Sequence, residues 1–206
     1  MSATQSGIRN LPLLIGTTIF SIVAGGLITW LGYYVPFIFI GSALLSIGSG
    51  LLTTFEVDTP TAKWVCYQLI AGMGIGLAFQ QPMIAAQTVL KQEDIPIGSA
   101  AVVFFQTLGG ALFISVAQNI FATELVNGIV AKVPDIAPWM ILNTGATALI
   151  STFPSEVLPQ ILEAYNGAVT KTFYASVALA IVGFIGGLGM EMVSVKGKKI
   201  EAIGGA

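Results

Sequence analysis

Long stretches without a single charged residue limit what this chain can fold into. The first runs from Asn10 to Phe55, and three others run from Trp64 to Leu90, from Ile97 to Thr123 and from Thr172 to Met190. A helix needs about 20 apolar residues to cross the hydrocarbon core of a bilayer, so the first stretch is long enough for two crossings. The sequence therefore predicts an all-α, polytopic membrane bundle with five transmembrane helices.

Composition supports a membrane protein and argues against several other classes. Hydrophobic residues make up 55% of the 206 residues and charged residues only 9%, against about 25% charged residues in soluble domains. The net charge of -2 offers no basic face for nucleic acid. With one cysteine, Cys66, and no histidine, the chain lacks a disulfide pair, the commonest zinc ligand and the commonest catalytic base. We therefore expect no enzyme, no metal and no cofactor.

The ends of the spans follow from charges and helix breakers. Gly32 and Pro36 divide the first stretch, because glycine and proline end helices. The third span is longer than a bilayer needs, so we expect it to tilt or to project beyond the membrane. The expected spans are 11–31, 36–54, 63–90, 97–123 and 171–191.

Residues 125–170 are expected to form one extramembrane capping loop within a single transmembrane domain, 1–206. Its charge-free part, 136–155, carries prolines and hydroxyls, so we interpret it as an interfacial or re-entrant segment and not as a sixth span. Next, Val157, Ile161 and Tyr165 recur at helical spacing, which predicts a short amphipathic helix lying on the membrane surface or on the rim of the protein.

The lysines after the last span indicate the orientation. Lys196, Lys198 and Lys199 favour a cytosolic tail, 192–206, by the positive-inside tendency. An odd number of spans then places the N-terminus on the non-cytosolic side. Arg9, Lys63 and Lys171 also fall on that side, which weakens the charge argument.

The third span carries the first candidate site. Met73, Gly76, Gln80, Met83 and Gln87 share one helical stripe, since seven residues make nearly two turns. An apolar wall interrupted by two amides suits a cavity for a large, mostly apolar solute. The same amides equally suit hydrogen bonds between helices.

Two further glutamines are candidates for the solute path. Gln106 is the preferred contact on the fourth span. Gln81 precedes Pro82, so it either lines the path or bonds a backbone carbonyl that the proline leaves free.

Small residues at four-residue spacing predict close helix packing. One set, Ser42, Ser46 and Gly50, lies on the second span. The candidate packing glycines are Gly72, Gly76, Gly109, Gly110, Gly183 and Gly187.

The chain resembles the C-terminal part of the fungal major facilitator superfamily, in particular the fourteen-span drug and toxin efflux branch. The resemblance covers essentially the whole chain and rests on the tracts 6–12, 64–68, 80–82 and 106–110, together with Asp94, Pro96 and Gly98. It implies a partial major facilitator fold made of the last five spans. Lys91, Asp94 and Gly98 would then belong to a short cytosolic loop, where we expect Asp94 to cap the fourth span or to pair with Lys91.

The resemblance implies an efflux transporter for small, largely apolar organic compounds such as a drug, toxin or secondary metabolite. Transport would be driven by proton exchange across what is expected to be the plasma membrane. The first half of such a transporter is absent, so we expect a truncated chain that is inactive alone and needs that half or another helix bundle as partner. The alternative is a non-transport assembly or regulatory protein that binds other helices through its small-residue faces.

Overall fold

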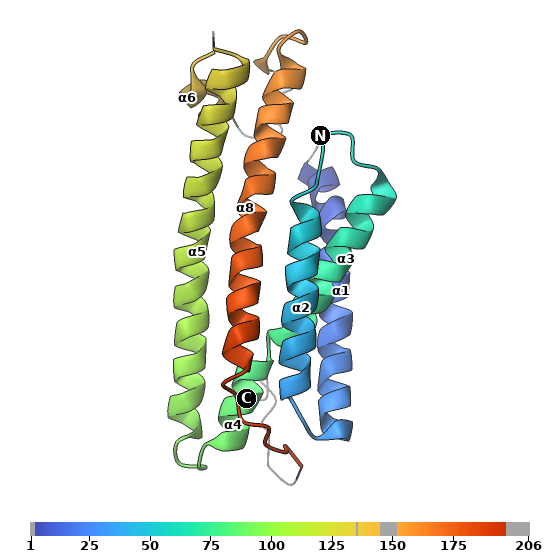
Figure 1. Ribbon diagram of the computed structural model, residues 1–206, viewed down its shortest axis with the longest axis vertical. Helices are drawn as coiled ribbons and strands as arrows, with labels where there is room; N and C mark the ends of the chain where they lie inside the picture. Colours follow the sequence, from blue (N-terminus) through green and yellow to red (C-terminus); the bar gives the residue numbers. More distant parts are fainter. Residues whose placement is uncertain (1–2, 135, 145–151, 197–206) are drawn as a thin grey trace.

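The computed structural model describes residues 3–134, 136–144 and 152–196, and it is a bundle of long antiparallel helices (Figure 1). Among these residues, five helical segments are long and apolar enough to cross a membrane, with α3 and α4 counted as one segment. This confirms the predicted all-α membrane bundle. The helices are α1 (Ala3–Leu31), α2 (Val35–Leu52), α3 (Thr61–Ala78), α4 (Gln81–Val89), α5 (Ile95–Lys132), α6 (Pro138–Asn143) and α8 (Leu158–Gly187).

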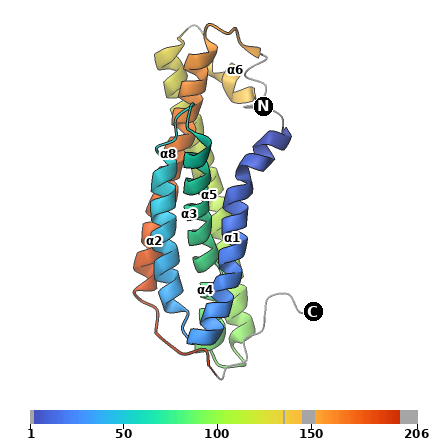
Figure 2. The ribbon, with the colours of Figure 1, turned by 90° about the vertical axis from the view of Figure 1, so that its right-hand side faces the viewer.

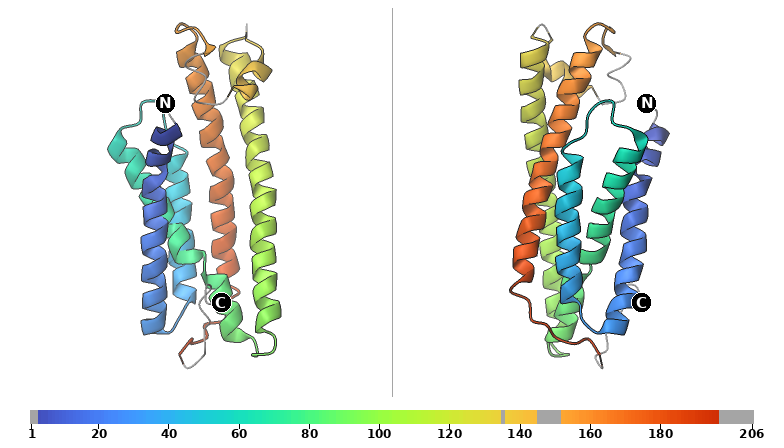
Figure 3. Two further views of the ribbon diagram at one scale, coloured as in Figure 1. Left: turned by 180° about the vertical axis from the view of Figure 1, so that it is seen from behind. Right: turned by 45° about the vertical axis from the view of Figure 1, so that its right-hand side comes forward.

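The membrane-length helices form a row whose third span reaches back to α5 at one end. Extensive contacts join α1 to α3, α3 to α2, α2 to α8 and α8 to α5, and α4, which continues the third span, packs beside the start of α5. Figure 1 and the left view of Figure 3 show α5 at one side of the molecule, with α8 as its long neighbour. We call the end with α6 and the loop 53–60 the upper end, and the end with the loops 32–34 and 90–94 the lower end. The helix α5 is therefore covered by α8 along its length and by α4 beside its start, and much of its surface stays open.

Glycines bring α3 close to both of its neighbours. In the run from Gly72 to Gly76, every second residue is glycine, which places Gly72 and Gly76 on one helix face and Gly74 on the opposite face. A Cβ atom on Gly76 would lie 2.5 Å from the Thr17 carbonyl oxygen of α1, and one on Gly74 would collide with Leu45 of α2. These contacts fix α3 between α1 and α2.

The other candidate packing glycines differ in their surroundings. A Cβ atom on Gly187 would lie 3.1 Å from the Ile38 side chain of α2, and one on Gly183 would lie 3.8 Å from the Ser42 hydroxyl. In contrast, a Cβ atom on Gly50, Gly109 or Gly110 would meet no atom of the described chain within 4 Å. The α8 glycines therefore lie at a helix contact, whereas Gly109 and Gly110 face open space.

The expected boundaries of the capping loop do not match the helices. The helix α5 continues to Lys132, and α8 begins at Leu158 and runs without interruption into the membrane-length part. The segment expected to be a separate surface helix is thus the first part of α8. It packs against α5. Together with residues of α6 and the adjoining segments, this contact forms what we call the upper apolar cluster: Phe121, Leu125, Ile129, Val133, Ile136, Ile141, Phe153, Val157, Ile161, Ala164, Tyr165 and Ala168.

The helices α5 and α8 continue past the charged residues expected at the span ends, because the charges pair between these two helices. The ammonium of Lys132 lies 2.6 Å from Glu163, and that of Lys171 lies 2.5 Å from Glu124. Of the segment 136–155, the structure describes residues 136–144, which include the six-residue helix α6, and residues 152–155; residues 145–151 lie outside the described residues.

The segment after α8 is fastened to the lower end of the bundle. The Tyr34 hydroxyl donates to the Glu191 carbonyl at 2.8 Å, and the Val195 N–H donates to the Gly32 carbonyl at 2.9 Å. Figure 2 shows this segment passing the lower end of α2. Burial raises the pKa of the Tyr34 phenol, and the Glu191 carboxylate raises it further. The protonated phenol is therefore the form that holds the segment.

Candidate functional site

The third span is interrupted at the position of its glutamines. The backbone ladder of α3 ends with the Phe79 N–H bond to Ile75, and it resumes in α4 with the Ile84 N–H bond to Gln80. Pro82 has no N–H to donate, so the ladder cannot continue through it. The four carbonyls from Gly76 to Phe79 consequently lie outside the helical ladder.

Two glutamine amides bond carbonyls at this break. Gln81 donates from Nε2 to the Leu77 carbonyl at 2.7 Å, which is the structural role that the sequence offered as one alternative. Gln106, on α5, donates from Nε2 to the Phe79 carbonyl at 3.3 Å. The first bond stays within one span, whereas the second joins two spans.

The break divides the stripe expected along the third span. Met73 and Gly76 lie on α3, Gln80 lies in the break, and Met83 and Gln87 lie on α4. Met83 and Gln87 are only 7% and 9% exposed. The stripe assumed one continuous helix, and the break at Pro82 removes that continuity.

Burial also separates the candidate glutamines. Gln81 is 1% exposed, and its Oε1 atom is buried without a hydrogen-bond partner in the described part of the chain. The side chains of Gln80 and Gln106 are exposed. A solute that approached the described chain could therefore reach Gln80 and Gln106 directly, but not Gln81.

A polar face on α5 was missed by the sequence analysis. Ser115, Asn119, Thr123 and Asn127 follow one another at four-residue spacing, and all are exposed. Each step of four residues turns the helix by only about 40° beyond a full turn, so these side chains form one slowly winding stripe. A shallow groove of about 580 Å³ follows it and is lined by Leu112, Ser115, Val116, Asn119, Ile120, Thr123 and Glu124.

The signal for this polar face was present in the sequence. The same four-residue spacing that was applied to glycines and serines also marks Asn119, Thr123 and Asn127. The face is distinct from that of Gln106, because Gln106 and Ser115 are nine residues apart and lie on opposite sides of an ideal helix.

Comparison with known proteins gives the family. The chain is 48% identical to the MFS-type efflux pump MFS1 of Arthroderma benhamiae over 97% of this chain and 37% of that pump. It is 44% identical to the MFS-type transporter astH of Aspergillus oryzae over 97% of this chain and 36% of that protein. It is also 44% identical to the aspyridones efflux protein of Neocamarosporium betae over 98% of this chain and 36% of that protein.

The chain belongs to the major facilitator superfamily. It spans little more than a third of the length of these relatives, for example 37% of MFS1. No protein-family model matches the chain. These relatives are named as efflux pumps and transporters, and proteins of this superfamily are not enzymes.

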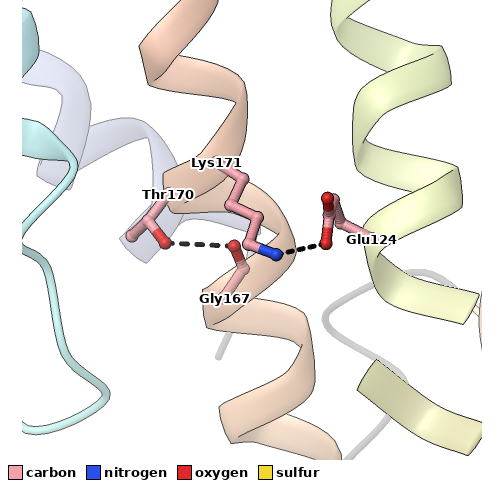
Figure 4. A network of polar contacts seen from close by, with 4 residues as sticks. All are labelled: Glu124, Gly167, Thr170 and Lys171. Atoms are coloured by element: carbon pink, nitrogen blue, oxygen red, sulfur yellow. Dashed lines mark hydrogen bonds and ion pairs between the residues drawn. The ribbon is translucent and has the colours of Figure 1, made fainter. Parts of the chain in front are cut away.

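A charged pocket lies at the upper end of this major facilitator chain. Its volume is about 650 Å³, and its charged lining residues are Glu56, Asp58, Glu124, Lys132, Glu163 and Lys171. Figure 4 shows Lys171 of α8 reaching toward Glu124 of α5, beside the Thr170 hydroxyl bond to the Gly167 carbonyl at 3.1 Å. Two ion pairs neutralise four of the six charges, so the loop carboxylates of Glu56 and Asp58 give the pocket its net negative charge.

The lower loop differs from the expectation in one respect. Asp94 is the residue before α5, but its side chain makes no capping hydrogen bond. Its backbone N–H donates to the Lys91 carbonyl at 2.9 Å, and its carbonyl accepts from the Gly98 N–H at 2.9 Å. Backbone bonds therefore form this turn, and a Cβ atom on Gly98 would collide with Leu90.

Proposed function

We propose that this chain is the C-terminal part of a major facilitator efflux transporter that exports small, largely apolar organic compounds. The names of the relatives support export, since MFS1 is an efflux pump and the protein of Neocamarosporium betae is an aspyridones efflux protein. Drugs, toxins and secondary metabolites are the solute classes that this proposal covers. Proton exchange supplies the energy, and the chain lies in the plasma membrane with its C-terminal tail in the cytosol.

The polar face of α5 is the observation that carries the proposal. An amide or hydroxyl moved into an apolar medium without a hydrogen-bond partner costs roughly 2–7 kcal/mol. The membrane-length part of α5 leaves the Asn119 amide uncovered by the described chain, whereas the neighbouring Ser115 hydroxyl donates to the Ala111 carbonyl at 3.1 Å. Polar residues in membrane spans face a bundle interior or a water-filled cavity. The face therefore borders a solute path or the remaining helices of the transporter.

The glutamines divide into two roles under this proposal. Gln80 and Gln106 are exposed beside the break and contact solute from this half of the transporter. Met73, Met83, Gln81 and Gln87 lie behind them and set the shape of that wall. The acid that exchanges protons lies in the rest of the transporter, because the described carboxylates of this chain lie in loops or in the upper parts of α5 and α8.

Reconstituted vesicles test the proposal. The chain alone should move no fluorescent apolar compound faster than empty vesicles, whereas the chain joined to the missing segment of a relative such as MFS1 should export it. Transport by the chain alone would disprove the need for a second half. A joined protein that inserts but exports no compound would favour the alternative role in assembly.

One substitution in the joined protein tests whether Gln80 belongs to the solute wall. Gln80→Leu should slow export without lowering membrane abundance, because it removes an exposed amide beside the break. Gln92→Leu is the matched control, since it removes an exposed amide in the lower loop. Equal export by both variants would remove Gln80 from the solute wall.

A further inference from the structure

Gln106 connects two spans at the one place where the third span is interrupted. We propose that Gln106 is a positioning residue: by capping the Phe79 carbonyl, it holds the break between α3 and α4 in its bent form and couples that break to α5. The inference deepens the proposed function, because it names the residue that sets the position of the Gln80 wall. Besides its own contact with solute, Gln106 thereby also acts on the wall through the backbone of the third span.

The break has only a few ways to satisfy its carbonyls. In a continuous helix, Phe79 would accept from the Met83 N–H, but the ladder of α4 begins one residue later. Gln106 supplies a donor to this carbonyl from the neighbouring helix. Since Gln81 bonds Leu77 within the same span, its bond persists wherever α5 moves. Only the Gln106 bond responds to the position of α5.

The two sides of the break differ in their packing. On one side, Gly72, Gly74 and Gly76 hold α3 against α1 and α2. On the other side, α4 packs on α5, and the turn between them brings Leu90 against Gly98. The helix α4 also shares an apolar cluster with α1, α2 and α3 through Ala85. Within the described chain, α4 and the Gln106 bond therefore connect the third span to α5.

The backbone angles at the break permit a change of its bend without strain. Phe79 has φ -60° and ψ -38°, and Gln80 has φ -89° and ψ -11°, both close to helical values. Small rotations at these two residues are enough to align α3 with α4. One net hydrogen bond changes the ratio of the bent to the straight form of the third span roughly fivefold. This is the effect expected from loss of the Gln106 amide.

Distances between spin labels on the chain in lipid nanodiscs test this inference. One label occupies the native Cys66, which is exposed on α3, and the other occupies Val89→Cys at the exposed end of α4. The parent should give one narrow distance distribution. Gln106→Leu should broaden it and raise a second population about fivefold.

The matched control is Gln118→Leu, which removes an exposed amide from the same helix about 18 Å above Gln106. It should leave the distribution unchanged. A distribution that is the same for Gln106→Leu and the parent, or that Gln118→Leu alters equally, overturns the inference.

Pro82→Ala provides an independent variant if Gln106→Leu is not recovered from the membrane. It restores a backbone N–H for the Ala78 carbonyl, so it should enrich the straight form even with Gln106 present. An unaltered distribution in Pro82→Ala would refute a mobile break. The labels report geometry without transport, so failure here leaves the vesicle test of the proposed function unaffected.

Discussion

The close approach of α2 and α3 leads to a sharp prediction for Gly48. A Cβ atom there would lie 2.5 Å from the Ala71 nitrogen and 2.6 Å from its Cα atom. Favourable carbon contacts lie at about 3.5–4.0 Å, so Gly48→Ala must push the two helices apart by about 1 Å. Overpacking of this kind costs about 1–3 kcal/mol.

A second glycine on the same helix isolates that effect. Alanine is favoured over glycine in a helix by about 1 kcal/mol, and this gain applies to Gly48→Ala and Gly50→Ala alike. A Cβ atom on Gly50 meets nothing within 4 Å among the described residues. Gly50→Ala should therefore be as stable as the parent or more stable. Gly48→Ala should be less stable than Gly50→Ala by about 1–3 kcal/mol.

The stability of both variants is measured by unfolding the chain in mixed micelles. Tryptophan fluorescence follows the unfolding as the fraction of denaturing detergent rises. Equal midpoints for Gly48→Ala and Gly50→Ala would refute the close contact between α2 and α3. A lower midpoint for Gly50→Ala would refute the interpretation of its surroundings as open.

Three further predictions concern the ends of the bundle. Asn166→Ala should lower the free energy of unfolding by about 1 kcal/mol in the same micelle assay, because the Asn166 amide donates to the Phe55 carbonyl at 2.7 Å. Lys171→Ala should cost under about 1 kcal/mol, and that difference should shrink in high salt, since the pair with Glu124 is partly exposed. The stabilising effect of Tyr34, measured against Tyr34→Phe, should be full below about pH 10 and should vanish as the pH rises through the folded pKa, because that pKa is raised. A parent-minus-variant difference that grows above pH 10 would contradict this sign.

The class of fold follows from the sequence because burial in lipid requires long runs without charge. The glycine run from 72 to 76 also indicates a helix that is approached on two faces. These features act locally, through residues a few positions apart on one helix. They are therefore visible without knowledge of the neighbours.

The features that were missed depend on partners far along the chain. Glu124 and Lys171 resemble span ends until their pairing across α5 and α8 is known. Pro82 indicated that a backbone carbonyl would be left free. The sequence could not show that an amide of another span, Gln106, bonds a carbonyl at this interruption of the third span. The polar face of α5 was missed for a different reason. Its side chains are shorter than the glutamines that were taken as candidates, and only their four-residue spacing marks them as one face.

The upper apolar cluster provides a point about which α5 can pivot. Leu125 and Ile129 are 1% and 0% exposed, so α5 is packed most tightly near its upper end. Gln106 lies 23 residues below Ile129, a distance of about 35 Å along the helix. A pivot of roughly 5° about the cluster would move Gln106 by about 3 Å, which is enough to make or break its bond to Phe79. The two ion pairs join α5 to α8 beside this cluster, so they lie at the pivot of such a movement and far from the broken span.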